Sequence, residues 1–135
     1  MIQHKHLILN GHIKNVPNKS ESFKMKLWIK RFIRNNGMQI QAEPVVSYVH
    51  AKGNRGMTAC GLLKTSHIAF HIWDEQEPAL FQFDFYTCGN LDVNNVIKLV
   101  NIKFDFYDVS YMVLNRENTI HIAAAGKDNF LVDSE

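Results

Sequence analysis

The chain has 135 residues, 46% of them hydrophobic, which is enough to close one hydrophobic core and predicts one domain over residues 1–135. Its 15 basic and 13 acidic side chains give a formal charge of +2, so charge alone indicates neither a nucleic-acid nor a membrane partner. No run reaches the ~18 apolar residues that a membrane span requires, and the first residues lack the pattern of a signal peptide. We therefore expect a soluble, cytoplasmic protein whose two cysteines are free thiols.

The first predicted element is a short strand over residues 4–9. The pair Asn10-Gly11 follows it, and such pairs are typical of turns. Residues 17–20 (P-N-K-S) contain proline and polar residues and are predicted to form a loop.

An amphipathic helix is predicted after this loop. Ser20 or Ser22 can cap its start, apolar residues recur at helical spacing over 23–33, and Gly37 stands where a helix would end. Basic residues take much of the opposite face. The simplest interpretation is that this basic face is exposed to solvent. The alternative is that it binds an acidic partner.

Three strands are predicted in the middle of the chain. Residues 38–50 alternate and are rich in β-branched residues, although Pro44 favours an edge position or a bulge. After a glycine-containing loop, residues 57–64 and 66–73 are predicted to be successive strands.

The alternation is sharpest over residues 80–88. Phe81, Phe83 and Phe85 share one face, and Cys88 lies on the other with the polar residues Gln82, Asp84 and Tyr86. One face of this strand is therefore predicted to pack in the core, and the other to carry polar groups.

The last part of the chain predicts a second helix and a further strand. Asp92 can cap the helix, and the strand covers residues 103–114. The segment after Asn115 is ambiguous between a strand and a helical turn. The order of elements predicts an α+β fold: a two-layer sandwich with a mostly antiparallel sheet and both helices on one face.

Ser66, His71 and Cys88 are the residues most capable of chemistry. A structural role is the common one for a histidine in a strand or a lone cysteine. A metal site built on His67 and His71 is improbable, because about 13 Å separates residues four apart in a strand. The sequence also lacks the G-x-S-x-G motif of serine hydrolases and any signature of a cysteine protease.

The segment S-H-I-A-F-H-I-W-D-E (66–75), followed by F-Y-T-C-G (85–89), resembles the core of the bacterial and archaeal S-adenosylmethionine decarboxylase proenzymes. The family pattern is Glu-Ser-His, three residues, His-Thr-x-Pro-Glu, and then Phe-Thr-Cys-Gly. The resemblance extends to K-H-L near the N-terminus and to His50, and covers roughly residues 4–110. The combined pattern is far more specific than any of its parts.

The resemblance implies that the protein makes its own cofactor. Ser66 would attack the carbonyl of Thr65, and the chain would be cut between 65 and 66, which leaves an N-terminal pyruvoyl group derived from Ser66. The ketone of that group condenses with a substrate amine and accepts the electron pair released when carbon dioxide leaves. By the same resemblance, Cys88 reprotonates the substrate carbon, His71 is the acid/base of chain cleavage, and Thr58 supports processing.

Strict alternation places Ser66 and His71 on opposite faces of one strand, because their positions differ in parity. If the two are to meet, the strand must be bulged or strained near Thr65-Ser66.

The sequence departs from the family at the cleavage point and in the substrate pocket. Thr65 stands where the family has glutamate, although the attacked atom belongs to the backbone. Trp73 and Glu75 match the positions that stack on the adenine and bind the ribose hydroxyls. Lys52 replaces the aromatic residue that completes the adenine sandwich, a change expected to weaken binding by ~1–3 kcal/mol.

The predicted function is pyruvoyl-dependent decarboxylation of S-adenosylmethionine, which yields the aminopropyl donor for spermidine synthesis. The resemblance implies a homodimer of self-cleaved chains, with S-adenosylmethionine as ligand and no metal. Two alternatives stay open: a pyruvoyl-dependent arginine or ornithine decarboxylase, and an unprocessed homologue that binds a ligand or a partner subunit without catalysis.

Overall fold

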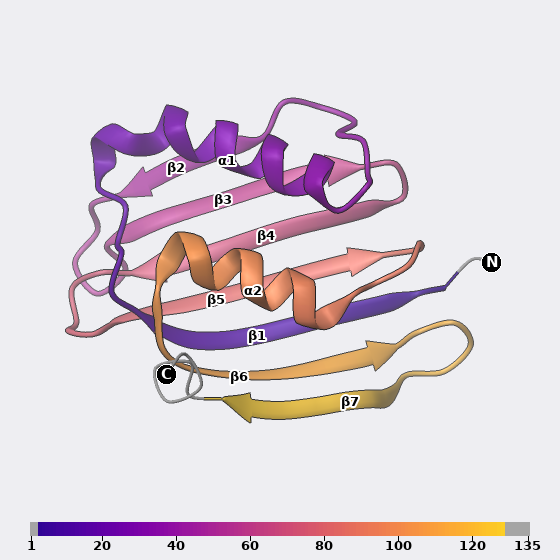
Figure 1. Ribbon diagram of the computed structural model, residues 1–135. Coiled ribbons are helices and arrows are strands. Elements are labelled where there is room, and N and C mark those ends of the chain that lie inside the picture. The colour runs from indigo at the N-terminus through magenta and orange to yellow at the C-terminus, as the bar shows by residue number, and fades with distance from the viewer. Residues whose placement is uncertain (1–2, 129–135) are drawn as a thin grey trace.

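The computed structural model describes residues 3–128, so the first two and the last seven residues of the predicted domain lie outside the described part. In the described part, seven antiparallel strands form one sheet, and two α-helices cover one of its faces (Figure 1). The predicted α+β two-layer sandwich is confirmed. The elements in chain order are β1 (Lys5–Ile13), the 3₁₀ turn η1 (Lys19–Glu21), α1 (Ser22–Asn35), β2 (Val45–Val49), β3 (Gly56–Leu63), β4 (Ser66–Trp73), β5 (Ala79–Thr87), α2 (Val93–Phe104), β6 (Phe106–Asn115) and β7 (His121–Asp128).

The strand order in the sheet is β2-β3-β4-β5-β1-β6-β7, so the first strand of the chain lies between β5 and β6. β1 is longer than predicted, because it continues through Asn10 and Gly11 to Ile13 and makes no turn at that pair. The glycine has a packing role there. A Cβ at position 11 would lie 2.8 Å from the carbonyl oxygen of Asp108 and from the ring of Phe106 on β6.

The helix ends follow the predicted signals in part. Asp92 caps α2 by accepting a hydrogen bond from the backbone N–H of Asn95 (3.1 Å), and Gly37, with φ 72°, follows the end of α1. The predicted serine caps of α1 are wrong. Asn18 caps η1 by accepting from the N–H of Ser20, and η1 leads directly into α1.

The sheet shortens one predicted strand and settles one ambiguous segment. Only residues 45–49 of the predicted strand 38–50 form β2, which starts just after Pro44 and lies at the sheet edge, where a proline is tolerated. Residues 121–128, ambiguous in the sequence, form β7 on β6. Neither α-helix of the described chain has the length and apolarity needed to cross a membrane.

Aromatic packing fixes the helices on one face of the sheet. The indole of Trp28 on α1 makes edge contacts with Phe70 on β4 and Phe104 on α2, at 6.2 and 5.3 Å between ring centroids. Phe32 lies in the same way against Phe83 and Phe85 of β5. Burial of each such ring contributes roughly 2–3 kcal/mol. Because both helices cover this face, the side chains of the opposite face remain open.

Candidate active site

The turn between β3 and β4 holds the predicted cleavage point. Thr65 has φ 60°, in the left-handed region, where a β-branched residue is strained by roughly 1–2 kcal/mol. The strain precedes the strand and does not produce a bulge, because β4 pairs with β3 and β5 without a register shift. The strain expected near Thr65-Ser66 is therefore present, but it lies in the turn.

Ser66 begins β4 beside Cys88, which follows the end of β5. The Cys88 backbone N–H donates to Ser66 Oγ (3.3 Å), and Ser66 Oγ lies 3.9 Å from Cys88 Sγ. The Thr65 hydroxyl is closer to the thiol, at 2.7 Å. We call Thr65, Ser66 and Cys88 the serine–cysteine cluster. Ser66 and Cys88 line a cavity of about 260 Å³ with Met38, Leu63 and Thr87 among its other walls.

The surroundings of Cys88 favour its thiolate. A hydrogen bond with Thr65 and then one with Ser66 lower the pKa of the Cys88 thiol, against a smaller opposing effect of burial. The nearby charge of Lys64 acts in the same direction as the hydrogen bonds. The thiol therefore gives up its proton more readily than an ordinary cysteine.

Thr58 and His71 form a second group, farther along the same strands. The two residues are register partners on β3 and β4, and Thr58 Oγ1 lies 3.1 Å from His71 Nδ1. Five positions of regular strand separate His71 from Ser66, which corresponds to about 16 Å. The structure therefore brings His71 to Thr58 and not to Ser66 of the same chain.

The two predicted substrate-binding residues lie beyond this pair. Trp73 has its ring 6.0 Å from that of His71, and its indole N–H donates to Asn54 Oδ1 (3.3 Å). Glu75 accepts a hydrogen bond from the backbone N–H of Arg55 (3.0 Å). Both line a cavity of about 360 Å³. Lys52 is exposed in the neighbouring loop.

A family model described as S-adenosylmethionine decarboxylase matches residues 6–117, well over half of the chain. The chain belongs to the S-adenosylmethionine decarboxylase family. The match includes both groups of residues described above and ends before β7. No curated protein matches the chain. Membership places the protein among decarboxylases and makes S-adenosylmethionine the ligand that the family implies.

An ionic network that was not predicted lies between Trp73 and Glu75 in this family member. Asp74 accepts a hydrogen bond from the Tyr48 hydroxyl (2.6 Å) and another from Arg55 Nε (2.6 Å). Burial would raise the pKa of the Asp74 carboxyl, but these hydrogen bonds outweigh it and lower the pKa. Gly56 lets the loop approach so closely, because a Cβ there would overlap the carbonyl of Ile72.

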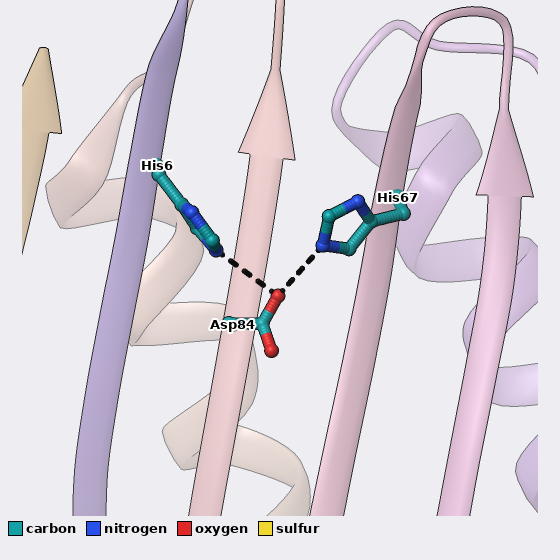
Figure 2. Close-up of side chains that lie close together, drawn as sticks. All are labelled: His6, His67 and Asp84. Atoms are coloured by element: carbon teal, nitrogen blue, oxygen red, sulfur yellow. Dashed lines mark hydrogen bonds and ion pairs between the residues drawn. The ribbon is translucent and has the colours of Figure 1, made fainter. Parts of the chain in front are cut away.

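A second unpredicted group lies on the open face of the decarboxylase sheet. His6 on β1 and His67 on β4 each place Nε2 near one oxygen of Asp84 on β5, at 3.1 and 2.9 Å (Figure 2). Burial alone would raise the pKa of the Asp84 carboxyl, but the two histidines outweigh it and lower the pKa. Tyr86 and Arg116 border the group, with the guanidinium 5.0 Å above the tyrosine ring.

The sequence held part of the signal for this group. Alternation along β5 places Asp84 on the polar face, but no local spacing joins it to a histidine, and the spacing of His67 and His71 is wrong for one ion. His71 is not in the group that the described residues form. The third member, His6, is 78 residues from Asp84 in the chain, and its pairing becomes visible only in the folded sheet.

Proposed function

We propose that the protein is a pyruvoyl-dependent S-adenosylmethionine decarboxylase that cuts its own chain between Thr65 and Ser66. The observation that carries the proposal is the serine–cysteine cluster: a serine hydroxyl held by the N–H of Cys88, directly after a strained Thr65. Strain before the scissile bond favours cleavage, because part of it is released when the peptide bond breaks.

The proposed cleavage follows from the atoms present. Ser66 Oγ attacks the carbonyl carbon of Thr65, the peptide C–N bond breaks, and an ester joins the two residues. Removal of the Cα proton of Ser66 then expels the Thr65 carboxylate. Water replaces the remaining amine, which leaves as ammonia, and residue 66 becomes the pyruvoyl terminus of fragment 66–135.

The residues present suit such a group. The pyruvoyl group supplies an electron-accepting carbonyl for the loss of carbon dioxide. Cys88, whose thiol lies 3.9 Å from Ser66 Oγ in the uncut chain, would carry a proton to the substrate carbon. Trp73 offers an indole face for the adenine, and the exposed carboxylate of Glu75 accepts hydrogen bonds from the ribose hydroxyls. The product is the aminopropyl donor for spermidine.

A homodimer would complete this site. Ser66 and Cys88 lie at one end of the sheet and Thr58 and His71 lie farther along it, so one chain cannot bring them to the same substrate. A second copy, related by a two-fold axis and packed on the open face, can bring its His71 to the end of the first chain's sheet where Ser66 and Cys88 lie. Exposed apolar side chains on that face support the packing: Ile8, Val45, Leu62, Met112 and Ile122.

Intact-mass measurement of the purified chain tests the proposal. We expect fragments 1–65 and 66–135 from the wild type, the second carrying a pyruvoyl group, and one uncut species from Ser66→Ala. A single uncut wild-type species that lacks decarboxylase activity would overturn the proposal and leave a binding protein. Carbon dioxide release from labelled S-adenosylmethionine, compared with arginine and ornithine, then identifies the substrate.

The role of Cys88 has its own test. Cys88→Ala should still be cut, although more slowly, and should lose most of its decarboxylase turnover, by about 10²-fold or more. Wild-type turnover in a fully cut Cys88→Ala protein would remove the proton-donor role.

A further inference from the structure

We propose that His6, His67 and Asp84 form a site for one divalent transition-metal ion of the zinc type. Their ligand atoms all lie within 4.8 Å of one another, and they project from three neighbouring strands, β1, β4 and β5 (Figure 2). The site is next to the serine–cysteine cluster, because His67 follows Ser66 in the chain, but the proposal for it does not depend on the decarboxylase activity.

The geometry is close to that of a bound ion. A tetrahedral zinc ion with bonds of about 2.0–2.2 Å spaces its ligand atoms about 3.3–3.5 Å apart. The two imidazole nitrogens lie 3.1 and 2.9 Å from Asp84 Oδ1. Each imidazole nitrogen therefore needs to move only a few tenths of an ångström away from the carboxylate oxygen, and the two nitrogens lie within 4.8 Å of each other.

The scaffold holds the ligands at these positions. His6 and His67 are both register partners of Tyr86, one on each side of β5. Their rings meet edge to face at 5.7 Å between centroids, and each also contacts the Tyr86 ring. Ligands carried on paired strands lose little conformational entropy when an ion binds.

The ligand set selects the kind of ion. Two imidazoles and one carboxylate suit zinc, cobalt or nickel, whereas magnesium and calcium prefer oxygen ligands. The side chains of His6, Asp84 and His67 are 16%, 33% and 41% exposed in the single chain, so an ion can enter there before a second copy packs on the open face, and water can complete its coordination.

Arg116 limits the affinity of the site. Its guanidinium nitrogen Nη1 lies 3.2 Å from His6 Nδ1. Because arginine only donates, Nδ1 accepts and the ring proton is on Nε2. A metal on Nε2 requires that proton to move to Nδ1, where it would face the arginine. Replacing Arg116 with glutamine removes the charge and offers an oxygen acceptor to Nδ1–H.

One consequence rests on the proposed function. His6 would belong to fragment 1–65, and His67 and Asp84 to fragment 66–135. A bound ion would then join the two fragments across the sheet, one residue from the new N-terminus.

The test uses the full chain without a histidine tag, treated with a chelator and carrying Ser66→Ala so that only one species is present. Zinc chloride is titrated by calorimetry, and cobalt chloride is followed by its visible absorption. We expect one ion per chain, lost in His67→Ala and in Asp84→Asn. Arg116→Gln should bind about 10-fold more tightly.

His12 provides the matched control. It lies on the same strand as His6 and pairs with Asp108 at 3.0 Å, without a second histidine. His12→Ala should bind like the parent. No binding by the parent, or equal binding by the His67 and His12 variants, would overturn the proposal. Circular dichroism checks the fold of each variant. If a ligand variant does not fold, His6→Gln takes its place and should also lose the ion. Because the uncut chain is used, failure here leaves the proposed function untouched.

Discussion

The Thr65 hydroxyl lies 2.7 Å from the Cys88 thiol, so the residue before Ser66 is a direct neighbour of the Cys88 sulfur. The same hydroxyl lies 2.6 Å from the carbonyl oxygen of Lys64. A hydroxyl has one proton, so it can donate to the carbonyl while the thiol donates to it, or turn and donate to a thiolate. Thr65 can therefore stabilise either protonation state of Cys88.

Removal of this hydroxyl should raise the pKa of the Cys88 thiol. Thr65→Val keeps the branched shape and loses the first of the two hydrogen bonds that lower the pKa. In the uncut Ser66→Ala background, the midpoint of iodoacetamide alkylation against pH should move to higher pH. Thr58→Val is the control, because Thr58 contacts His71 and not Cys88. An unchanged midpoint in the Thr65 variant would contradict the role of this hydrogen bond.

The strain at Thr65 predicts an order of stability between two other variants. Both Thr65→Ala and Thr65→Gly lack the hydroxyl, but only glycine accepts φ 60° without strain. In the Ser66→Ala background, urea unfolding should find the glycine variant about 1 kcal/mol more stable than the alanine variant. With Ser66 intact, the alanine variant should cut itself faster. Equal stability and equal rates would mean that the turn stores no useful strain.

A shared site predicts complementation between two defective chains. Ser66→Ala keeps His71, and His71→Ala keeps Ser66 and Cys88, so a mixed dimer contains one complete site. We expect mass spectrometry to find the His71→Ala chain cut when the two are co-expressed, but not, or far more slowly, when it is expressed alone. Co-expression of His71→Ala with a second chain carrying both substitutions is the control. If cutting does not improve in the mixed dimer, each site is built within one chain.

Asp74 should stabilise the fold in a pH-dependent way. Its pKa is lower in the folded chain than in the unfolded one, so its contribution is present above pH ~4 and is lost as the pH falls through the folded pKa. The difference in unfolding free energy between wild type and Asp74→Asn should be constant from pH 7 to about pH 5 and shrink below pH ~4. Tyr48→Phe, which removes one of its hydrogen bonds, should show a smaller effect of the same sign. A difference that grows on acidification would contradict the assignment.

Local signals predicted much of the fold. Periodic patterns predict which side chains are buried. The structure buries Trp28, predicted from helical spacing, and Phe81, Phe83 and Phe85, predicted from alternation. The turn predicted at Asn10-Gly11 was wrong, because a glycine needed for close packing looks the same in the sequence as a glycine in a turn.

The candidate site was predicted less completely than the fold. Sequence motifs named Ser66, His71 and Cys88, but motif spacing cannot show that regular pairing keeps His71 away from Ser66. The group of His6, His67 and Asp84 was missed for a related reason. Its members meet through the pairing of β1 with β5. The register between strands so far apart in the chain cannot be predicted from local hydrophobic periodicity.

The position of β1 also constrains how the chain folds. Lys5 pairs with Thr87 on one side and with Asn115 on the other, so β1 can pair with both of its neighbours only after β6, about 100 residues later in the chain, has been made. Such distant pairings make folding slow, because long loops must close before their contacts form. The proposed cut at residue 65 has to wait for this event. If the chain were cut before β1 had paired, β1 would no longer be covalently joined to β5 and β6, and its insertion between them would become a slower reaction between two separate fragments.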